Sequence, residues 1–484
     1  MSDQSIVPAR SSSVSFSRAA WLLASLVPAI FLLCFLALAS YAAPEHDDFC
    51  FLSQNLHDGF VHTVLSYYNE WSGRVVPFLL IQFPSEIAKA TGINIVPAYA
   101  ATLASFTVVF IAATAFAVVR AWPGLPVQAA LFLSLAFPAA IIAAAPSLHV
   151  LLYWLPGLTC YVPPRIISAL VLGEVIRALG DRGGFSWPVA VTMAIGGLVA
   201  ATCNEFTAVW LFGIVASSLL ARRYLGRELQ VGHHVLVAAA VLIGWVIILS
   251  APGNSARLAA TGGIHDVLYV APRALNYAVL DLGRFISCPS VVAWCVVAGA
   301  VTLAEPESRR PALSHGGMLA SRNVVLCLAC CYFEYFMHHL TTGVRLVERA
   351  QNQALILLFF GLTLSTSLLV RTYRRDISRY LAFASSWSLD SVALPAALAG
   401  LFALSLYGSQ AAVRLRAERE AFYPFWQESV ARYRLLATRP EPVVAVPEHK
   451  WRPSVIMAAD LADSECLASY FGKSRIIPAE RAAP

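Results

Sequence analysis

Three acidic residues stand where a carboxylate could act on a substrate in this 484-residue chain. Asp47 and Asp48 are adjacent and follow the first long apolar run, and Glu205 separates two later apolar runs. A charge at membrane depth is costly and usually functional. A carboxylate that reaches a hydroxyl group can remove its proton, which speeds a transfer reaction by roughly 10²- to 10⁴-fold. We therefore predict these three acids as catalytic candidates, and the choice between Asp47 and Asp48 stays open.

Arginines and amides occur in segments that we expect on the same side of the membrane as the acids. The turn before Arg257 ends in Asn254, and a later loop holds His338 and His339 followed by Arg345 and Arg349. A guanidinium binds phosphate oxygens through two parallel hydrogen bonds, which suits an anionic substrate. The polar residues that we predict to bind substrate are Arg74, Asn204, Asn254, Arg257, Arg345 and Arg349.

Aromatic residues complete the set of candidates. Trp71 lies near Arg74, and His149 and Trp154 follow the third apolar run. Their rings could stack on a sugar, or the tryptophans could simply anchor the chain at the membrane interface. Each charged candidate also has a structural alternative. The acidic pair could solvate the end of the first helix, Glu205 could pair with a neighbouring helix, and Arg257 could cap a helix or contact lipid phosphate.

The elements that must position these residues are membrane helices. Hydrophobic residues make up 58% of the chain and charged residues 13%, about half the charged share of a soluble domain. The sequence predicts an all-α, polytopic bundle of about eleven transmembrane helices over residues 1–406, followed by a small extracytoplasmic extension over residues 407–484. The predicted spans are Trp21–Ala43, Ile95–Val119, Val127–Ala145, Ile166–Leu179, Pro188–Ala201, Phe206–Leu220, Val235–Ser250, Val291–Leu303, Val324–Phe336, Ala354–Val370 and Val392–Leu406.

Arginine distribution predicts the orientation. Alternate loops carry the arginines, which is typical of the cytoplasmic side of an inner-membrane protein with a cytoplasmic N-terminus. The candidate residues and the C-terminus then face the periplasm or the exterior. In the first outer loop, residues 44–94, the amphipathic stretch Phe60–Tyr68 is expected to lie flat in the interface. The arginines used are Arg120, Arg182, Arg222, Arg223, Arg227, Arg309, Arg310, Arg371, Arg374, Arg375 and Arg379.

Cofactor and redox signals are few. The ten cysteines show no zinc-ligand spacing. A disulfide on the oxidising side is allowed but cannot be assigned among Cys50, Cys160, Cys203, Cys288 and Cys466. No metal or other cofactor is predicted as required, although an Asp-Asp pair suits Mg²⁺ or Mn²⁺. The dispersed basic residues do not indicate nucleic acid, and the absence of a phosphate-binding glycine loop disfavours ATP-driven transport and direct use of a nucleotide sugar.

Several short motifs occur in a characteristic order. They are Asp47-Asp48-Phe49-Cys50, Trp71-Ser72-Gly73-Arg74, Asn204-Glu205, Ala251-Pro252-Gly253-Asn254 with Arg257, and Ala468-Ser469-Tyr470-Phe471-Gly472. In this order the chain resembles a family of bacterial multipass proteins grouped with membrane glucosyltransferases, and more broadly the GT-C glycosyltransferase superfamily. The similarity spans nearly the whole chain, but each motif alone is short.

This resemblance implies transfer of glucose or a similar hexose on the outer face of the bacterial inner membrane. The donor would be a polyprenyl-phosphate sugar embedded among membrane lipids, and the acceptor a glycan, lipid or protein of the envelope. An acid of the first outer loop, here Asp47 or Asp48, would act as general base. Two alternatives are a multipass transporter or flippase, expected to place key polar groups near the bilayer midplane, and a ligase of lipid-linked glycans.

Overall fold

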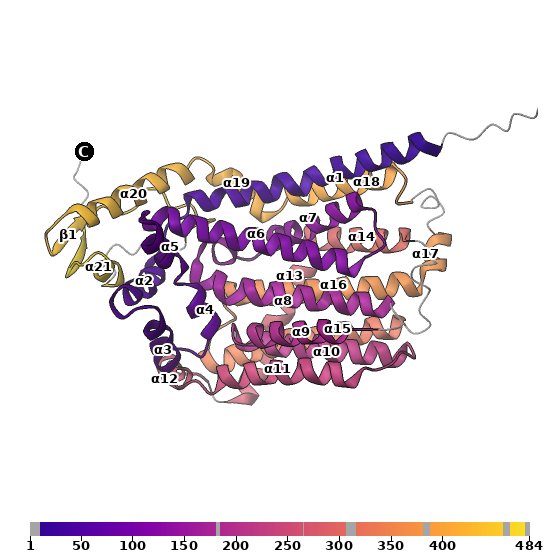
Figure 1. Cartoon of the computed structure of the whole chain (residues 1–484), viewed down its shortest axis with the longest axis horizontal. Helices are drawn as coiled ribbons and strands as arrows, with labels where there is room; N and C mark the ends of the chain where they lie inside the picture. Colours follow the sequence, from indigo (N-terminus) through magenta and orange to yellow (C-terminus); the bar gives the residue numbers. More distant parts are fainter. Residues whose placement is uncertain are drawn as a thin grey trace, which may run out of the picture.

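The computed structural model describes residues 10–180, 184–264, 266–305, 316–380, 388–457 and 465–479, and within them the chain is almost entirely helical. Figure 1 shows the long helices running side by side along the length of the molecule. Eight of them are long and apolar enough to cross a membrane. They are α1 (Arg10–Leu38), α6 (Ile95–Ala121), α7 (Val127–Ala144), α8 (Leu155–Gly180), α10 (Glu205–Tyr224), α11 (Val231–Leu249), α15 (Gly316–Thr342) and α16 (Glu348–Thr372).

Two bent helix pairs raise the number of candidate spans to ten. The first joins α13 (Val267–Ile286) to α14 (Pro289–Ala304) at 62°, and the second joins α18 (Ala393–Tyr407) to α19 (Gln410–Glu418) at 56°. A further apolar helix, α9 (Trp187–Ala201), is shorter than the roughly 20 residues that a span needs. The structure therefore confirms a multipass helical bundle, whereas the count of eleven crossings stays a prediction.

Residues 44–94 fold into four short helices at one end of the bundle, which we call the α2 end. They are α2 (His46–Asp58), α3 (Phe60–Glu70), α4 (Val75–Leu80) and α5 (Phe83–Thr91), and a single 3-10 turn η1 (Ala39–Tyr41) leads from α1 toward them. Gly59 separates α2 from α3 at a φ of 82°, which a residue with a side chain rarely adopts. α3 is amphipathic, with Val61 and Leu65 exposed and Val64 buried, as the predicted interfacial segment requires.

The opposite end, which we call the α17 end after α17 (Arg374–Tyr380), collects the arginines that indicated the cytoplasmic side. Arg120 at the end of α6 pairs with Glu174 of α8, Arg222 at the end of α10 donates to the Ala178 carbonyl, and Arg374 donates to the Leu303 carbonyl at the end of α14. Figure 1 shows α17 and α2 at opposite ends. Arg182, Arg309 and Arg310 lie outside the described residues.

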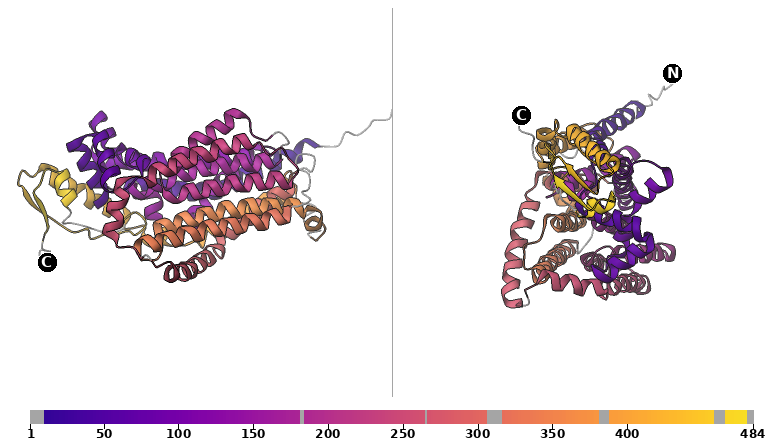
Figure 2. Two further views of the ribbon diagram at one scale, coloured as in Figure 1. Left: turned by 90° about the horizontal axis from the view of Figure 1, so that it is seen from below. Right: turned by 90° about the vertical axis from the view of Figure 1, so that its left-hand side faces the viewer.

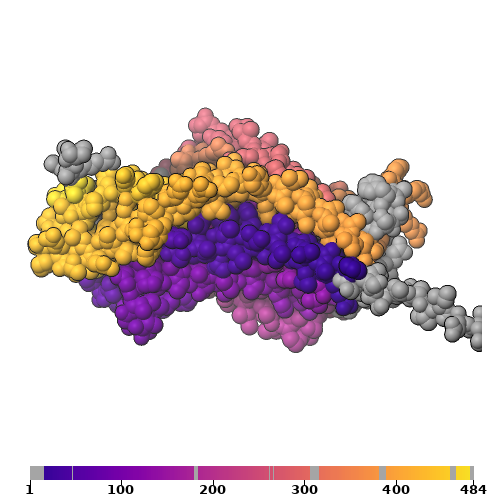
Figure 3. Space-filling view, turned by 90° about the horizontal axis from the view of Figure 1, so that it is seen from above, coloured from indigo at the N-terminus to yellow at the C-terminus, as the bar shows by residue number. Residues whose placement is uncertain are grey.

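The C-terminal region folds back over the α2 end. It comprises α20 (Phe422–Thr438), β1 (Val443–Val446), α21 (Glu465–Tyr470) and β2 (Arg475–Pro478), and the two strands pair in parallel with Val443 opposite Arg475. In Figure 2 the yellow strands lie at the α2 end, and Figure 3 shows α18 and the following helices lying along indigo α1. The short parallel sheet departs from the all-α expectation.

A disulfide between Cys50 of α2 and Cys466 of α21 joins segments 416 residues apart in the sequence. The same contact contains a hydrogen bond of 2.7 Å between the hydroxyl oxygens of Ser53 and Ser469. Phe49 also packs its ring against Tyr470 at 5.2 Å. The disulfide that the sequence allowed but could not assign is therefore Cys50–Cys466, and it fixes α2 against the C-terminal region.

Replacing Cys50 by Ser should lower the midpoint of thermal unfolding. The cross-link lowers the conformational entropy of the unfolded chain, which adds about 2–4 kcal/mol to the free energy of unfolding. Differential scanning fluorimetry of the purified full chain measures the shift, and reductant should move wild type toward the variant. Cys34→Ser removes an exposed free cysteine of α1 and serves as the control. Equal midpoints for Cys50→Ser and Cys34→Ser would show that the disulfide carries no stability.

Candidate active site

A cavity of ≈ 300 Å³ opens at the α2 end, between the short helices and the ends of the long ones. Its walls come from α2, α3, α4, the start of α8, the start of α16, and α12 (Pro252–Thr261). The predicted site residues that line it are Asp47, Trp71, Arg74, Trp154, Arg257 and Arg349. Segments that are far apart in the sequence therefore meet around one cavity that carries acidic, basic and aromatic side chains.

The acidic pair divides into one exposed and one buried carboxylate. Asp47 lines the cavity and is exposed, and no hydrogen bond or ion pair engages it within the described part of the chain. Asp48 is only 1% exposed, because it points into the protein beneath α2. Of the two neighbours, Asp47 alone is placed to meet a substrate.

Asp48 has a structural position. It is the third residue of α2, and its carboxylate accepts a hydrogen bond of 2.8 Å from the Glu45 backbone N–H in a reciprocal capping box. The same oxygen accepts a hydrogen bond of 2.9 Å from the Tyr99 hydroxyl of α6. Burial raises the pKa of Asp48 well above its ordinary value. Asp48 therefore fixes the start of α2 on the bundle and is poorly suited to accept a proton from a substrate.

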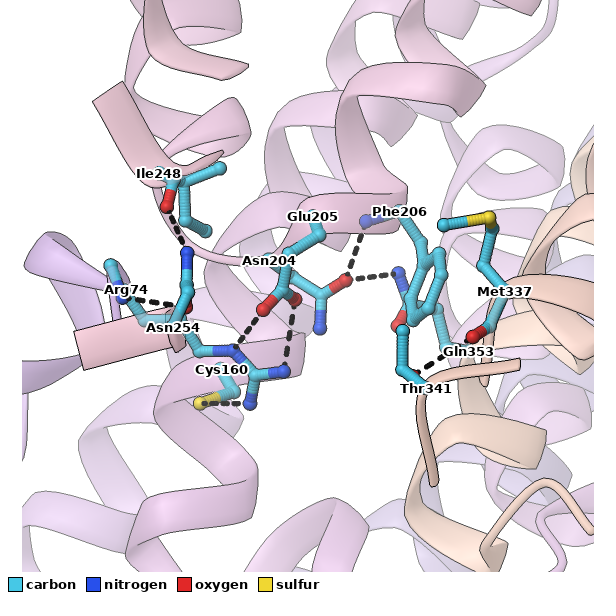
Figure 4. A network of polar contacts seen from close by, with 11 residues as sticks. Arg74, Cys160, Asn204, Glu205, Phe206, Ile248, Asn254, Met337, Thr341 and Gln353 are labelled. Atoms are coloured by element: carbon cyan, nitrogen blue, oxygen red, sulfur yellow. Dashed lines mark hydrogen bonds and ion pairs between the residues drawn. The ribbon is translucent and has the colours of Figure 1, made fainter. Parts of the chain in front are cut away.

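Glu205 forms an ion pair with Arg74, as Figure 4 shows. Arg74 Nη2 lies 2.9 Å from Glu205 Oε2 and Arg74 Nε lies 3.3 Å from Oε1, so the pair is bidentate. Asn204 accepts a hydrogen bond of 2.9 Å from the Phe206 backbone N–H and thereby starts α10 at Glu205. The structural alternative considered for Glu205, pairing with a neighbouring segment, describes its position.

Through two glycines, the Trp71–Arg74 segment meets the backbone of the end of α11 and of the start of α12. A Cβ on Gly253 would lie 2.5 Å from the Trp71 nitrogen, and a Cβ on Gly73 would lie 2.1 Å from the Ile248 carbonyl oxygen. Asn254 accepts a hydrogen bond of 3.2 Å from the Gly73 N–H, and its amide donates to the Ile248 carbonyl. Asn254 thus joins the Trp71–Arg74 segment to the end of α11 by hydrogen bonds. Its role in the site is to position these segments.

Two arginines at the cavity wall make cation–π contacts with tryptophan rings. Arg257 lies 5.9 Å from the Trp71 ring centroid, and Arg349 lies 5.8 Å from that of Trp154. Such contacts orient a guanidinium at the cavity wall, and guanidinium groups bind anions through their N–H groups. The neighbouring positive charge of Arg74 lowers the pKa of Arg257. Crowded guanidiniums of this kind repel one another, and a bound anion would relieve that repulsion.

One wall of the cavity is aromatic and apolar. Phe51 of α2 lies with its ring centroid 4.2 Å from that of Tyr67 of α3, and Tyr67 lies 5.1 Å from Phe78 of α4. Burial, together with the charge of Asp47, raises the pKa of Tyr67 to about 12, so its hydroxyl stays protonated at neutral pH. The cavity therefore offers a charged side and an apolar side.

Other predicted residues lie away from the cavity lining. Arg345 pairs with the buried Asp281 of α13, with Nε 3.4 Å from Oδ2. His149, in the short π-helical turn η2 (His149–Tyr153), is buried with its Nε2 2.8 Å from Glu45 Oε1. The expected loop position of His338 and His339 is wrong, because α15 continues to Thr342 and includes them.

Sequence reasoning also missed residues of and near the site. Tyr67, Cys160 and Tyr161 line the cavity but carry no charge that would single them out. Deeper in the bundle, Arg165 of α8 and Glu334 of α15 are 1% and 0% exposed. A signal was available for Glu334, since it lies inside the predicted span Val324–Phe336 and a charged residue inside an apolar run usually has a function.

Among the described residues, no group of three or more His, Cys, Asp or Glu side chains could hold a metal ion. This observation does not test the option, left open by the sequence, that Mg²⁺ or Mn²⁺ binds at the Asp47-Asp48 pair. No family model and no curated protein matches the sequence, and no solved structure matches the fold. Function must be argued from the site itself.

Gly253→Ala should destabilise the protein by about 1–3 kcal/mol, because the added Cβ meets backbone that cannot move without shifting the Trp71–Arg74 segment. The midpoint of thermal unfolding of the purified chain measures the effect. Gly283→Ala is the matched control, since a Cβ at that helical position of α13 meets nothing within 4 Å. If both variants unfold at the wild-type temperature, the close backbone approach is not a constraint.

Proposed function

We propose that the protein is a membrane glycosyltransferase that moves a hexose from a polyprenyl-phosphate donor to a glycan, lipid or protein acceptor of the cell envelope. The observation that carries the proposal is the single cavity that combines the exposed Asp47 carboxylate with Arg257 and Arg349. Sugar rings are commonly held on aromatic faces, and Trp71 and Trp154 supply such faces beside the cations. A base for the acceptor hydroxyl, cations for the phosphate and aromatic faces for the sugar together suit a transfer of a sugar from a phosphate.

The reaction assigns one role to each group. Asp47 accepts the proton of the acceptor hydroxyl, whose oxygen forms a bond to the anomeric carbon of the donor sugar. The bond between that carbon and the phosphate oxygen breaks, and the phosphate leaves with the electron pair. Since a phosphate leaving group is already ionised, it needs no proton. Arg257 and Arg349 stabilise its growing negative charge.

A lipid-linked donor is supported by the surroundings of the cavity. The cations face an apolar wall of Phe51, Tyr67 and Phe78, and the neighbouring α3 exposes Val61 and Leu65. An amphipathic helix of this kind lies at a membrane surface, where the headgroup of a polyprenyl phosphate would also lie. The donor could therefore enter with its phosphate toward the arginines and its chain toward the lipid.

The membrane orientation is part of the proposal. Concentration of arginines at the α17 end favours that end as cytoplasmic, which leaves the α2 end and the C-terminal region periplasmic or extracellular. A disulfide at the α2 end accords with an oxidising compartment. The protein would then reside in the bacterial inner membrane and act on its outer surface.

A transporter is the second candidate, because Arg165 and Glu334 lie deep among the long helices. Intramembrane ionisable residues often mark ion or substrate pathways. The cavity and its cations, however, lie at the helix ends and not among the midplane residues. This position favours chemistry at the surface over alternating access.

The proposal predicts that Asp47→Asn abolishes transfer whereas Asp48→Asn retains most of it. Asparagine at position 48 still offers an oxygen to the Glu45 N–H and the Tyr99 hydroxyl, so α2 keeps its start. Asparagine at position 47 cannot take a proton, and the rate should fall by roughly 10²- to 10⁴-fold. Mass spectrometry of envelope glycans from a deletion strain complemented with each variant measures the outcome.

Equal membrane expression of wild type and both variants, checked by immunoblot, is the control for that comparison. Loss of one sugar unit on deletion, with restoration by Asp48→Asn and not by Asp47→Asn, is the expected pattern. A glycan profile that Asp47→Asn restores fully would exclude the mechanism and move the transporter candidate ahead.

A further inference from the structure

Beneath the cavity, polar side chains form a seam between α8, α10, α15 and α16, which the active-site mechanism does not use. The seam consists of residues whose buried polar atoms have no hydrogen-bond partner among the described residues. We call this group the polar seam; its members are Arg165, Ser168, Thr207, Trp210, Glu334 and His338. Asn204 and Gln353, which are hydrogen-bonded to each other, adjoin it with one unpartnered atom each (Figure 4).

Arg165 and Glu334 are the charged members, and they lie near the middle of the bundle. At 1.5 Å per residue, Arg165 is about 15 Å along α8 from its start, and Glu334 is about 12 Å from the end of α15. All three nitrogens of the Arg165 guanidinium and both carboxylate oxygens of Glu334 are unpartnered. The two groups interact electrostatically but do not form a direct ion pair in the described structure.

The seam reaches the cavity at two places. The Arg165 guanidinium lies 5.4 Å from the centroid of the Tyr161 ring, and Tyr161 lines the cavity. His338 is four residues after Glu334 on α15, so both side chains lie on one face of the helix. His338 also interacts electrostatically with Arg349, a cation of the cavity. A path from Glu334 to the cavity therefore follows His338.

The chemistry of the unpartnered atoms indicates what fills the seam. Arg165 and Trp210 offer only donors, Glu334 and the Gln353 carbonyl oxygen accept, and Thr207 can do both. An anion could satisfy the donors but would leave the Glu334 carboxylate unmatched, and a cation would leave Arg165 unmatched. Water donates and accepts, and buried water typically makes about three hydrogen bonds to groups of this kind.

Space for water is present at the deep end of the seam. Trp210 and Cys330 line a cavity of ≈ 30 Å³, and a buried water needs about 10–15 Å³ by this measure. Ser217 and Asn323 are further polar side chains in its lining, and the remaining walls are mostly apolar, including Leu357 and Leu364.

We propose that bound water molecules fill the polar seam and connect it to the cavity at the α2 end, so that Glu334 exchanges its proton with that cavity. The inference is independent of the proposed sugar transfer. The charged and titratable groups around the path are Cys160, Tyr161 and Arg165 on α8, Glu205 on α10, Cys330, Cys331, Tyr335, His338 and His339 on α15, Arg349 on α16, and Arg74 and Arg257 at the cavity. The protonated form of Glu334 releases its proton through water to His338 and on to the cavity, which leaves the Glu334 carboxylate, and no other bond changes.

Hydroxyl-radical footprinting of the full chain in lipid nanodiscs, made by X-ray radiolysis and read by mass spectrometry, tests for the water. Trp210 and Trp21 form a matched pair, since both are 1% exposed. The indole N–H of Trp21 donates to the Leu389 carbonyl at 3.0 Å, whereas that of Trp210 has no partner among the described residues. Radicals form where water is bound, so Trp210 should be oxidised several-fold more than Trp21, with ¹⁸O incorporated from labelled water. Equal protection of both would overturn the hydrated seam.

Infrared spectroscopy of the same sample tests the exchange. The C=O band of a protonated carboxyl group should shift on transfer to D₂O, vary with bath pH and disappear in Glu334→Gln. Asp281→Asn is the control, because Asp281 is equally buried but is held by Arg345 and the Tyr335 hydroxyl. Proton exchange at Glu334 is excluded if Glu334→Gln removes no such band at any bath pH. It is also excluded if the frequency of the band does not change on transfer to D₂O.

Discussion

The bidentate ion pair between Arg74 and Glu205 is the constraint on which the α2 end depends. It joins the loop before α4 to the first residue of α10, 131 residues later, at the edge of the bundle. The two side chains are 16% and 22% exposed, so the ion pair is partly buried and its separation would leave both charges incompletely solvated, which favours holding the two segments together. Close packing of Gly73 and Gly253 then brings α12 to the same place. The cavity is the space that these fixed segments leave between them.

This arrangement separates charges that are paired or buried from charges that lie on tryptophan rings or are exposed at the cavity. Arg74 is balanced by Glu205, and Asp48 is buried in the cap of α2. Arg257 and Arg349 rest on tryptophan rings, and Asp47 is exposed at the cavity. A site with two oriented guanidiniums and one accessible carboxylate suits a phosphate-linked substrate and a hydroxyl acceptor, which is the basis of the glycosyltransferase proposal.

The positions of charges relative to apolar runs could be read from the sequence, and this reading placed Asp47, Arg257 and Arg349 in loops on one side of the membrane. These three residues do meet at one cavity. What the sequence could not supply was contacts between distant segments. Burial of Asp48 depends on Tyr99 approaching from α6, and the disulfide partner of Cys50 lies 416 residues away. Arg345 looked like a substrate ligand until its partner Asp281 was located. Arg165 was missed because it stands just before a predicted span, inside what is one continuous helix, α8.

A cryo-EM structure of the full chain in lipid nanodiscs, bound to a short-chain polyprenyl-phosphate hexose, tests the central claim most directly. The account predicts density for the phosphate within hydrogen-bond distance of Arg257 and Arg349, with the hexose between the tryptophan rings and its anomeric carbon facing the side of Asp47. It also predicts the isoprenoid chain against the apolar wall formed by Phe51, Tyr67 and Phe78. An empty cavity at saturating ligand, or a ligand bound at the polar seam instead, would contradict the assignment of this cavity as the site of sugar transfer.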